Sequence, residues 1–202
     1  STPDLEGAKR FYAGLLDWTY DPSDPEMGHY TICRRNGKMV AGMAPKQPGF
    51  DMPTVWSLYL KCSDLDAMAK RITDGGGNLL MQPMQIPGSG RMLFATDPTG
   101  AALGLWEPAA HRGAELYDEV GTMCWHDGHP VCGRMQMTAE WANIPPHWMN
   151  YFSVADCDAS VARLRELGGE VKHGPDDSPY GRFAIVSDPY GAVFAIIAAQ
   201  PG

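Results

Sequence analysis

The chain repeats its own pattern, and this repeat constrains the fold more than any other feature. Residues 90–106 read GRMLFATDPTGAALGLW, and residues 181–197 read GRFAIVSDPYGAVFAII. In both, an apolar stretch runs into Asp-Pro-x-Gly. This motif favours a tight turn because Pro fixes φ, Asp bonds to the backbone ahead and Gly accepts a positive φ. A second apolar stretch follows, so each copy predicts a β-hairpin.

The similarity extends upstream of both hairpins. Residues 54–83 match residues 146–175, with Trp56 aligned to Trp148 and Asp64 aligned to Asp156. Each block predicts a strand, then an Asp that caps a helix, then a helix that Gly-Gly ends, then a further strand. With its hairpin, each copy is predicted to be a β-α-β-β-β module of about fifty residues.

Two weaker copies occupy the rest of the sequence. In the first, a helix is predicted from Asp4 to about Asp17, and its leading strand is expected before Ser1. Three strands should follow the helix, at 18–20, 29–35 and 39–44, with Asn36-Gly37 as a hairpin turn. The other weak copy, third in chain order, is expected to begin with a strand at 121–125 and to resume at 128–137, without its helix. Either the protein has lost that segment, or the segment belongs to the protein but is not among these 202 residues. The second alternative is favoured, since a true deletion would leave one wall of a domain open.

Composition narrows the class of protein and of partner. Hydrophobic residues make up 44% and charged residues 20%, which is typical of a soluble globular chain. The longest apolar run, 192–199, is too short to cross a bilayer. The net charge of −8 argues against nucleic acid and anionic membranes as partners. Five cysteines without a CxxC motif favour reduced thiols and a cytoplasmic location.

An ordered set of motifs now points to a family. Asp-Leu-Glu-x-Ala-x-x-Phe-Tyr, then Asp-x-Asp-Ala on a helix, then Gly-Arg leading to Asp-Pro-x-Gly-Ala, resembles the vicinal oxygen chelate (VOC) superfamily. This superfamily includes glyoxalase I, bleomycin-resistance proteins and extradiol dioxygenases. The resemblance implies an α+β fold, in which tandem βαβββ modules form two glyoxalase/bleomycin-resistance-type domains with curved mixed sheets around a cavity. The domains are predicted at 1–108 and 121–202, joined by a linker at 109–120.

The resemblance also implies where a metal would bind. Enzymes of this superfamily usually hold one divalent metal on His, Glu or Gln. The corresponding positions carry Ser57 and Gly104 in the first domain and Met149 and Ala195 in the second. Such residues replace the hydration shell of a hard cation poorly. No metal site and no cofactor are therefore predicted. A zinc site on Cys124, His126, His129 and Cys132 is disfavoured because its spacing fits structural zinc sites poorly.

Candidate ligand-binding residues follow from strand alternation. Ser57, Tyr59, Met149 and Tyr151 should face the cavities, whereas Leu58, Leu60, Phe152 and Val154 should face the helices. Trp106 and Trp125 are further pocket candidates because they lie in last or first strands. His147 shares the face of Met149; a hydrogen-bonding wall is the favoured role, and a catalytic base is the alternative. Six methionines on or beside predicted strands would suit a bulky, flat, apolar ligand, although ordinary core filling is favoured for each of them: Met81, Met84, Met92, Met135, Met137 and Met149.

The fold is expected to form a cavity, but the usual metal-ligand positions carry no metal-ligating side chains. This combination favours a protein that binds a small molecule. It would bind or sequester a partly aromatic metabolite or antibiotic without a metal. The alternative is a metal-dependent lyase, dioxygenase or hydroxylase of the same superfamily, with Fe, Zn, Ni or Mn. A metal-free acid–base enzyme that uses His147 is a third option. The expected partner is a small molecule, and the sequence leaves a homodimer open.

Overall fold

The chain forms two compact units, and each is described by itself. The structure is a computed structural model that describes residues 1–47, 49, 53–124, 137 and 144–199. Unit 1 comprises residues 1–56, 114–132 and 150–202, and unit 2 comprises residues 57–113 and 133–149. Unit 1 thus draws on both predicted domains. The predicted order of two consecutive domains with a linker at 109–120 stays a prediction.

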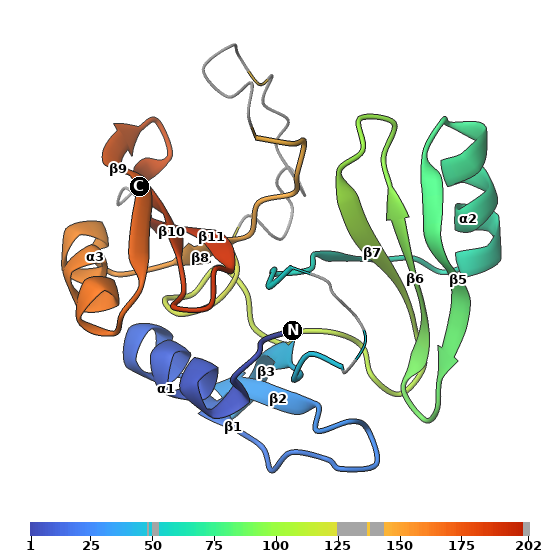
Figure 1. The fold of residues 1–202 in the computed structure, drawn as a ribbon, viewed down its shortest axis with the longest axis horizontal. Helices are drawn as coiled ribbons and strands as arrows, with labels where there is room; N and C mark the ends of the chain where they lie inside the picture. Colours follow the sequence, from blue (N-terminus) through green and yellow to red (C-terminus); the bar gives the residue numbers. More distant parts are fainter. Residues whose placement is uncertain (48, 50–52, 125–136, 138–143, 200–202) are drawn as a thin grey trace. The chain divides into compact units, whose positions relative to one another are not determined.

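Unit 2 contains one complete βαβββ module, with helix α2 against its sheet (Figure 1). The strands lie in the order β4-β7-β6-β5, with β4 parallel to β7 and the other neighbours antiparallel. Its elements are β4 (Tyr59–Lys61), α2 (Leu65–Asp74), β5 (Asn78–Ile86), β6 (Gly90–Thr96) and β7 (Ala102–Pro108).

Unit 1 contains two modules, one from each end of the sequence. The C-terminal module has the strand order β8-β11-β10-β9, which repeats the order in unit 2. The N-terminal module has the order β1-β2-β3, and Thr2 makes a parallel bridge with Pro45 beside it. The elements are α1 (Leu5–Leu16), β1 (Thr19–Tyr20), β2 (Thr31–Arg35), β3 (Lys38–Met43), β8 (Tyr151–Ser153), α3 (Cys157–Glu166), β9 (Glu170–Ser178), β10 (Gly181–Ser187) and β11 (Val193–Ala199).

The three helices in the described residues begin in the same way, as the repeat predicts. Asp4, Asp64 and Asp156 each accept a hydrogen bond from the backbone N–H three residues ahead, at 2.8, 2.9 and 3.0 Å. These side chains satisfy donors that a helix N-terminus leaves open. After α2 and α3, Gly76 and Gly168 adopt φ of 88° and 86°, a conformation that glycine accepts without strain. The predicted caps are therefore confirmed.

Both Asp-Pro-x-Gly segments form the predicted turns. In the first, one Asp97 carboxylate oxygen accepts hydrogen bonds from the backbone N–H groups of Thr99 and Ala101, at 2.8 and 3.1 Å. In the second, Asp188 accepts from Tyr190 and Ala192, each at 2.9 Å. The Asp side chain therefore holds each turn closed and sets the register of the hairpin that the turn joins.

The core of unit 1 is aromatic and spans both of its modules. The rings of Tyr12, Trp18, Trp56, Phe152 and Phe194 lie within 4.9–5.9 Å of ring neighbours. At its centre, Trp56 Nε1 donates to the Tyr12 hydroxyl at 2.8 Å, and this hydroxyl donates to Asp188 at 2.9 Å. Burial and the neighbouring Asp188 carboxylate raise the pKa of Tyr12 well above its ordinary value. The hydroxyl therefore stays protonated and bridges α1 to the C-terminal module.

The core of unit 2 is smaller and aliphatic. Leu65 and Ala69 of α2 pack against Leu93, Ala95 and Leu105 of the sheet, and all five are buried. Four cysteines lie in the described residues, at 33, 62, 124 and 157, and these are free thiols. In the described part of the chain, no helix is long and apolar enough to cross a membrane.

Candidate functional site: the open face of the unit 2 sheet

The unit 2 sheet has two different faces because strand residues alternate in direction. Leu60, Leu93 and Leu105 point toward α2 and form the core. The prediction that Leu60 faces the helix is confirmed, as are the equivalent predictions for Phe152 and Val154 in unit 1. The opposite face of the unit 2 sheet is left for other contacts, and it carries the predicted residues Tyr59 and Trp106.

Strand register places the side chains of this second face in two rows. One row contains Met81, Phe94, Gly104 and Tyr59, because Gly104 is paired with both Phe94 and Tyr59 and Met81 is paired with Phe94. The next row contains Met84, Met92, Trp106 and Lys61 in the same way. We call the six large apolar members the open face: Tyr59, Met81, Met84, Met92, Phe94 and Trp106.

Two glycines make room for the aromatic rings of the open face close to the backbone of the sheet. A Cβ at Gly104 would lie 2.5 Å from the Tyr59 ring, and a Cβ at Gly90 would lie 2.7 Å from the Trp106 ring. The Tyr59 ring contacts Phe94 at a centroid distance of 5.2 Å, a common aromatic edge geometry. Trp106 Nε1 donates to the His111 carbonyl at 2.8 Å, which fixes the orientation of the indole.

The open face remains accessible although it is apolar. Tyr59 is 41% exposed and Met84 is 44% exposed, while Met81, Met92, Phe94 and Trp106 are half-buried. Large exposed apolar patches on soluble domains commonly mark places where a ligand or partner binds. Lys61 is the charged residue in the second row, next to Trp106.

Unit 1 has a related face on the β8-β11-β10-β9 sheet. Tyr151, the repeat equivalent of Tyr59, is paired with Ala195, and Ala195 is paired with Ile185. Ala195 and Ile185 are buried and Tyr151 is half-buried, so this face is more enclosed. Burial, followed by the nearby Cys124 thiol, raises the pKa of Tyr151. A tyrosine beside a small residue is thus common to both modules.

The other predicted site residues do not gather at the open face. Ser57 is exposed and precedes β4, and Met149 is half-buried and precedes β8. His147 is exposed, and its Nδ1 lies 2.9 Å from the Pro145 carbonyl, so this nitrogen donates. Trp125 lies outside the described residues, as do His126, His129 and Cys132.

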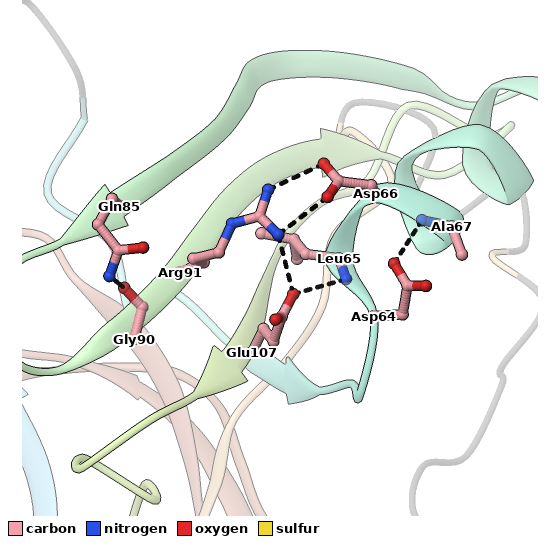
Figure 2. A network of polar contacts seen from close by, with 8 residues as sticks. All are labelled: Asp64, Leu65, Asp66, Ala67, Gln85, Gly90, Arg91 and Glu107. Carbon is pink, nitrogen blue, oxygen red and sulfur yellow. Dashed lines mark hydrogen bonds and ion pairs between the residues drawn. The ribbon is translucent and has the colours of Figure 1, made fainter.

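A network of charges lies on the helix side of the same sheet (Figure 2). Arg91 pairs with Asp66 in the first turn of α2 through two hydrogen bonds of 2.9 Å, and it also contacts Glu107 at 3.3 Å. Glu107 accepts the Leu65 backbone N–H at 2.8 Å. Arg182 repeats the ion pair with Asp158 at 2.6 and 3.0 Å. These arginines therefore link the helices α2 and α3 to their sheets.

Sequence comparison identifies the family. The sequence profile of the Glyoxalase/Bleomycin resistance protein/Dioxygenase superfamily matches residues 1–105 and again residues 106–196. The chain belongs to this superfamily. The match covers almost the whole chain, and it agrees with the α+β fold of repeated βαβββ modules around curved sheets.

Relatives of this superfamily member include proteins of two kinds. A Mycobacterium tuberculosis protein provisionally named glyoxylase CFP32 is 36% identical over 241 positions, covering 99% of this chain and 92% of that protein. The anthracycline biosynthesis protein DnrV of Streptomyces peucetius is 34% identical, covering 100% of this chain and 91% of that protein. The structure of the 2,3-dioxygenase LapB from Pseudomonas sp. KL28 shares the fold, with a TM-score of 0.56, 11% identity and coverage of 99% of this chain and 90% of LapB.

The positions at which the resemblance places metal ligands carry residues that coordinate a hard cation poorly. Gly104 has no side chain, and the Tyr59 ring fills the space that a ligand would need. Ala195 is buried and cannot coordinate, and neither Ser57 nor Met149 is a hard anionic ligand. Within residues 1–47, 49, 53–124, 137 and 144–199, no three or more His, Cys, Asp or Glu side chains are grouped to hold a metal ion.

Phe94, Lys61 and the two glycines are site residues that sequence reasoning missed. The predicted hairpin could have located Phe94, because its turn pairs residue 94 with residue 104 once the register is fixed. From the sequence, Gly104 is predicted only to be a position without a metal-ligating side chain. Gly104 makes room for the Tyr59 ring only because β4 pairs in parallel with β7, and a single sequence does not specify this pairing.

Proposed function

We propose that this protein binds a flat, partly aromatic small molecule on the open face, without a metal ion. The observation that carries the proposal is the pair of aromatic rings on adjacent strands, the exposed Tyr59 and the half-buried Trp106, which lie among three methionines. Such rings stack on planar ligands, and methionine side chains adapt to irregular ligand edges.

The chemistry of the open face also indicates the polarity of the ligand. The indole N–H of Trp106 is already bonded to the His111 carbonyl, so this ring offers its surface rather than a donor. Lys61 supplies a positive charge at the edge of the face. We therefore expect a ligand with a fused-ring body and an anionic or carbonyl oxygen at one side, such as a hydroxyquinone.

The relatives support the same ligand class. Two Streptomyces relatives are named as anthracycline biosynthesis proteins, and anthracyclines are flat fused-ring quinones. A planar polyketide of this type combines the apolar surface and the edge oxygens that the open face would recognise. Sequestration of such a compound, or its presentation to another enzyme, would need neither a metal nor a catalytic base.

The direct test is titration of the full chain with a panel of anthracyclines and simpler anthraquinones. We expect saturable binding, measured by calorimetry and by quenching of the ligand fluorescence, with equal affinity before and after EDTA treatment. Tyr59→Ala should weaken binding about tenfold, since it removes one stacking ring. Tyr180→Ala, at a turn where the ring is 67% exposed, is the matched control and should leave affinity unchanged. Absence of binding across the panel would count against the proposal.

Metal analysis separates this proposal from a metal-dependent enzyme. Elemental analysis of protein purified without an affinity tag should give far less than one equivalent of Fe, Zn, Ni or Mn per chain. A stoichiometric metal that is lost in EDTA together with ligand binding would overturn the metal-free proposal. It would instead favour the lyase or dioxygenase chemistry of other superfamily members.

A further inference from the structure

Unit 2 also has a pocket on the other side of its sheet, beside α2. Its volume is about 370 Å³, and it is walled by the side of α2, the Asp97 turn and Trp148. The lining is mostly apolar, with Leu60 and Leu103 from the sheet. This pocket lies on the face opposite to the open face, and the proposed ligand does not use it.

The repeat shows what occupies the same place in unit 1. The residues that line the unit 2 pocket align with residues that hold α1 in unit 1. Trp148 aligns with Trp56, Asp97 with Asp188, Leu103 with Phe194, Arg71 with Arg163 and Leu60 with Phe152. In unit 1, α1 therefore lies where unit 2 has a pocket.

The contacts of α1 in unit 1 are specific. The Tyr12 hydroxyl accepts from Trp56 Nε1 at 2.8 Å and donates to Asp188 at 2.9 Å. The Tyr12 ring contacts Phe194 at 5.8 Å between centroids. Near the end of the helix, Arg163 Nε donates to the Gly14 carbonyl at 3.2 Å. Unit 1 thus binds both the Tyr12 side chain and the C-terminal end of α1.

The matching groups in unit 2 have hydrogen-bonding capacity left over. Trp148 Nε1 is buried and has no hydrogen-bond partner, although a buried indole N–H usually has one. Asp97 uses one carboxylate oxygen for its own turn, and in the described part of the chain its Oδ2 accepts no hydrogen bond. A donor and an acceptor with the roles of Trp56 and Asp188 therefore line one apolar pocket.

Within the described residues, no second helix of the α1 type lies in this pocket. Between β7 and β8, the described residues contain no helix, and the Asp-Leu-Glu-x-Ala-x-x-Phe-Tyr pattern of α1 occurs once in the sequence. The alignment with the mycobacterial relative spans 241 positions, whereas 99% of this chain is about 200 residues. About 40 alignment positions therefore have no counterpart here, which is enough for a helix and a strand.

We propose that the unit 2 pocket is a docking site for an amphipathic helix of another polypeptide, with the chemistry of α1. Its tyrosine would enter between Trp148 and Asp97, accept from the indole N–H and donate to the carboxylate. Arg71 would bind the carbonyls at the C-terminal end of that helix. The partner is recognised by a Phe-Tyr pair on the apolar side of a helix that an acidic residue caps.

The test uses the full chain and a peptide with the sequence of residues 3–17. A hydrocarbon staple replaces the peptide's Glu6 and Arg10, which are exposed in α1 and one turn apart, because a free peptide of this length is barely helical. Calorimetry should show one binding site in unit 2, and ¹⁵N-indole NMR should show a shift of the Trp148 N–H. A peptide with Tyr12→Phe should bind about tenfold more weakly, since it leaves both partners unpaired.

Variants of the full chain locate the site. Trp148→Phe and Asp97→Asn should each reduce affinity for the tyrosine peptide about tenfold. Neither variant should further weaken binding of the phenylalanine peptide, because that peptide already lacks the hydroxyl group. Trp56→Phe is the matched control: it should lower the unfolding temperature of the protein without changing affinity for the peptide. Three results would overturn the proposal: no binding at millimolar peptide, equal affinity for the two peptides, or equally tight binding of a simple phenol.

Discussion

Removal of one hydroxyl group from the core of unit 1 tests whether the Trp56–Tyr12–Asp188 network stabilises the fold. Tyr12→Phe keeps the ring and its aromatic contacts, so little packing is lost. Trp56 Nε1 and the Asp188 carboxylate would each lose a hydrogen bond, of 2.8 and 2.9 Å respectively. An unpaired buried donor costs about 1–3 kcal/mol, and a bond to a charged group contributes a similar amount. We therefore expect the free energy of unfolding to fall by about 3 kcal/mol.

Equilibrium urea unfolding, followed by tryptophan fluorescence and by far-UV circular dichroism, measures this change. Tyr20→Phe is the internal comparison, because the Tyr20 hydroxyl makes one hydrogen bond, to the Lys9 carbonyl at 2.8 Å. Its loss should cost about 1 kcal/mol. If Tyr12→Phe changes stability by no more than Tyr20→Phe, the network is not the strong link between α1 and the C-terminal module that its geometry suggests.

Three further predictions concern the open face, the thiols and the helix caps. Gly104→Ala should displace the Tyr59 ring, lower stability by about 1–3 kcal/mol in thermal unfolding and weaken anthraquinone binding, whereas Ala102→Ser on the same strand should do neither. Burial raises the pKa of Cys33 to about 12, so this thiol ionises first in the unfolded state. The free energy of unfolding should therefore fall as pH rises from about 9 to 12, and this thiol should contribute up to about 1.4 kcal/mol per pH unit. In Cys33→Ala, the midpoint of urea unfolding should fall less steeply with pH over the same range. Asp64→Ala removes the α2 cap and should cost about 1 kcal/mol by urea unfolding, with Asp64→Asn close to the parent.

Local features of the fold could be predicted from the sequence because their determinants lie close together along the chain. The helix expected from Asp4 to about Asp17 runs from Leu5 to Leu16, with Asp4 and Asp17 as its caps. The turn expected at Asn36-Gly37 is present, with φ of 51° and 75°. In each case a capping side chain or a turn residue specifies the structure within four or five residues.

Features that depend on distant contacts could not be predicted in this way. The repeat indicates that α1, α2 and α3 are equivalent, but it does not specify which helices pack together. That choice rests on contacts such as Tyr12 with Asp188, which are 176 residues apart. The role of Arg91 has a related cause: its long side chain reaches Asp66, 25 residues away in the sequence, and only the folded chain brings the two together.

The candidate site was predictable in part. Successive side chains of a strand point to opposite faces of the sheet, and this rule holds within a short strand. It correctly places Tyr59 and Leu60 on opposite faces. It could not supply the neighbours of Tyr59, because β5 contains two register irregularities that change which of its residues face Phe94 and Met92.

The union of the first and last modules in unit 1 has a consequence for biosynthesis. During translation, α1 leaves the ribosome long before Asp188 and Phe194 exist, so Phe11 and Tyr12 have no core to enter for most of the time that the chain is being made. Contacts of such long sequence separation form slowly. In the nascent protein, Phe11 and Tyr12 therefore lack their partners until the Asp188 turn and the seven residues of β11 have been made.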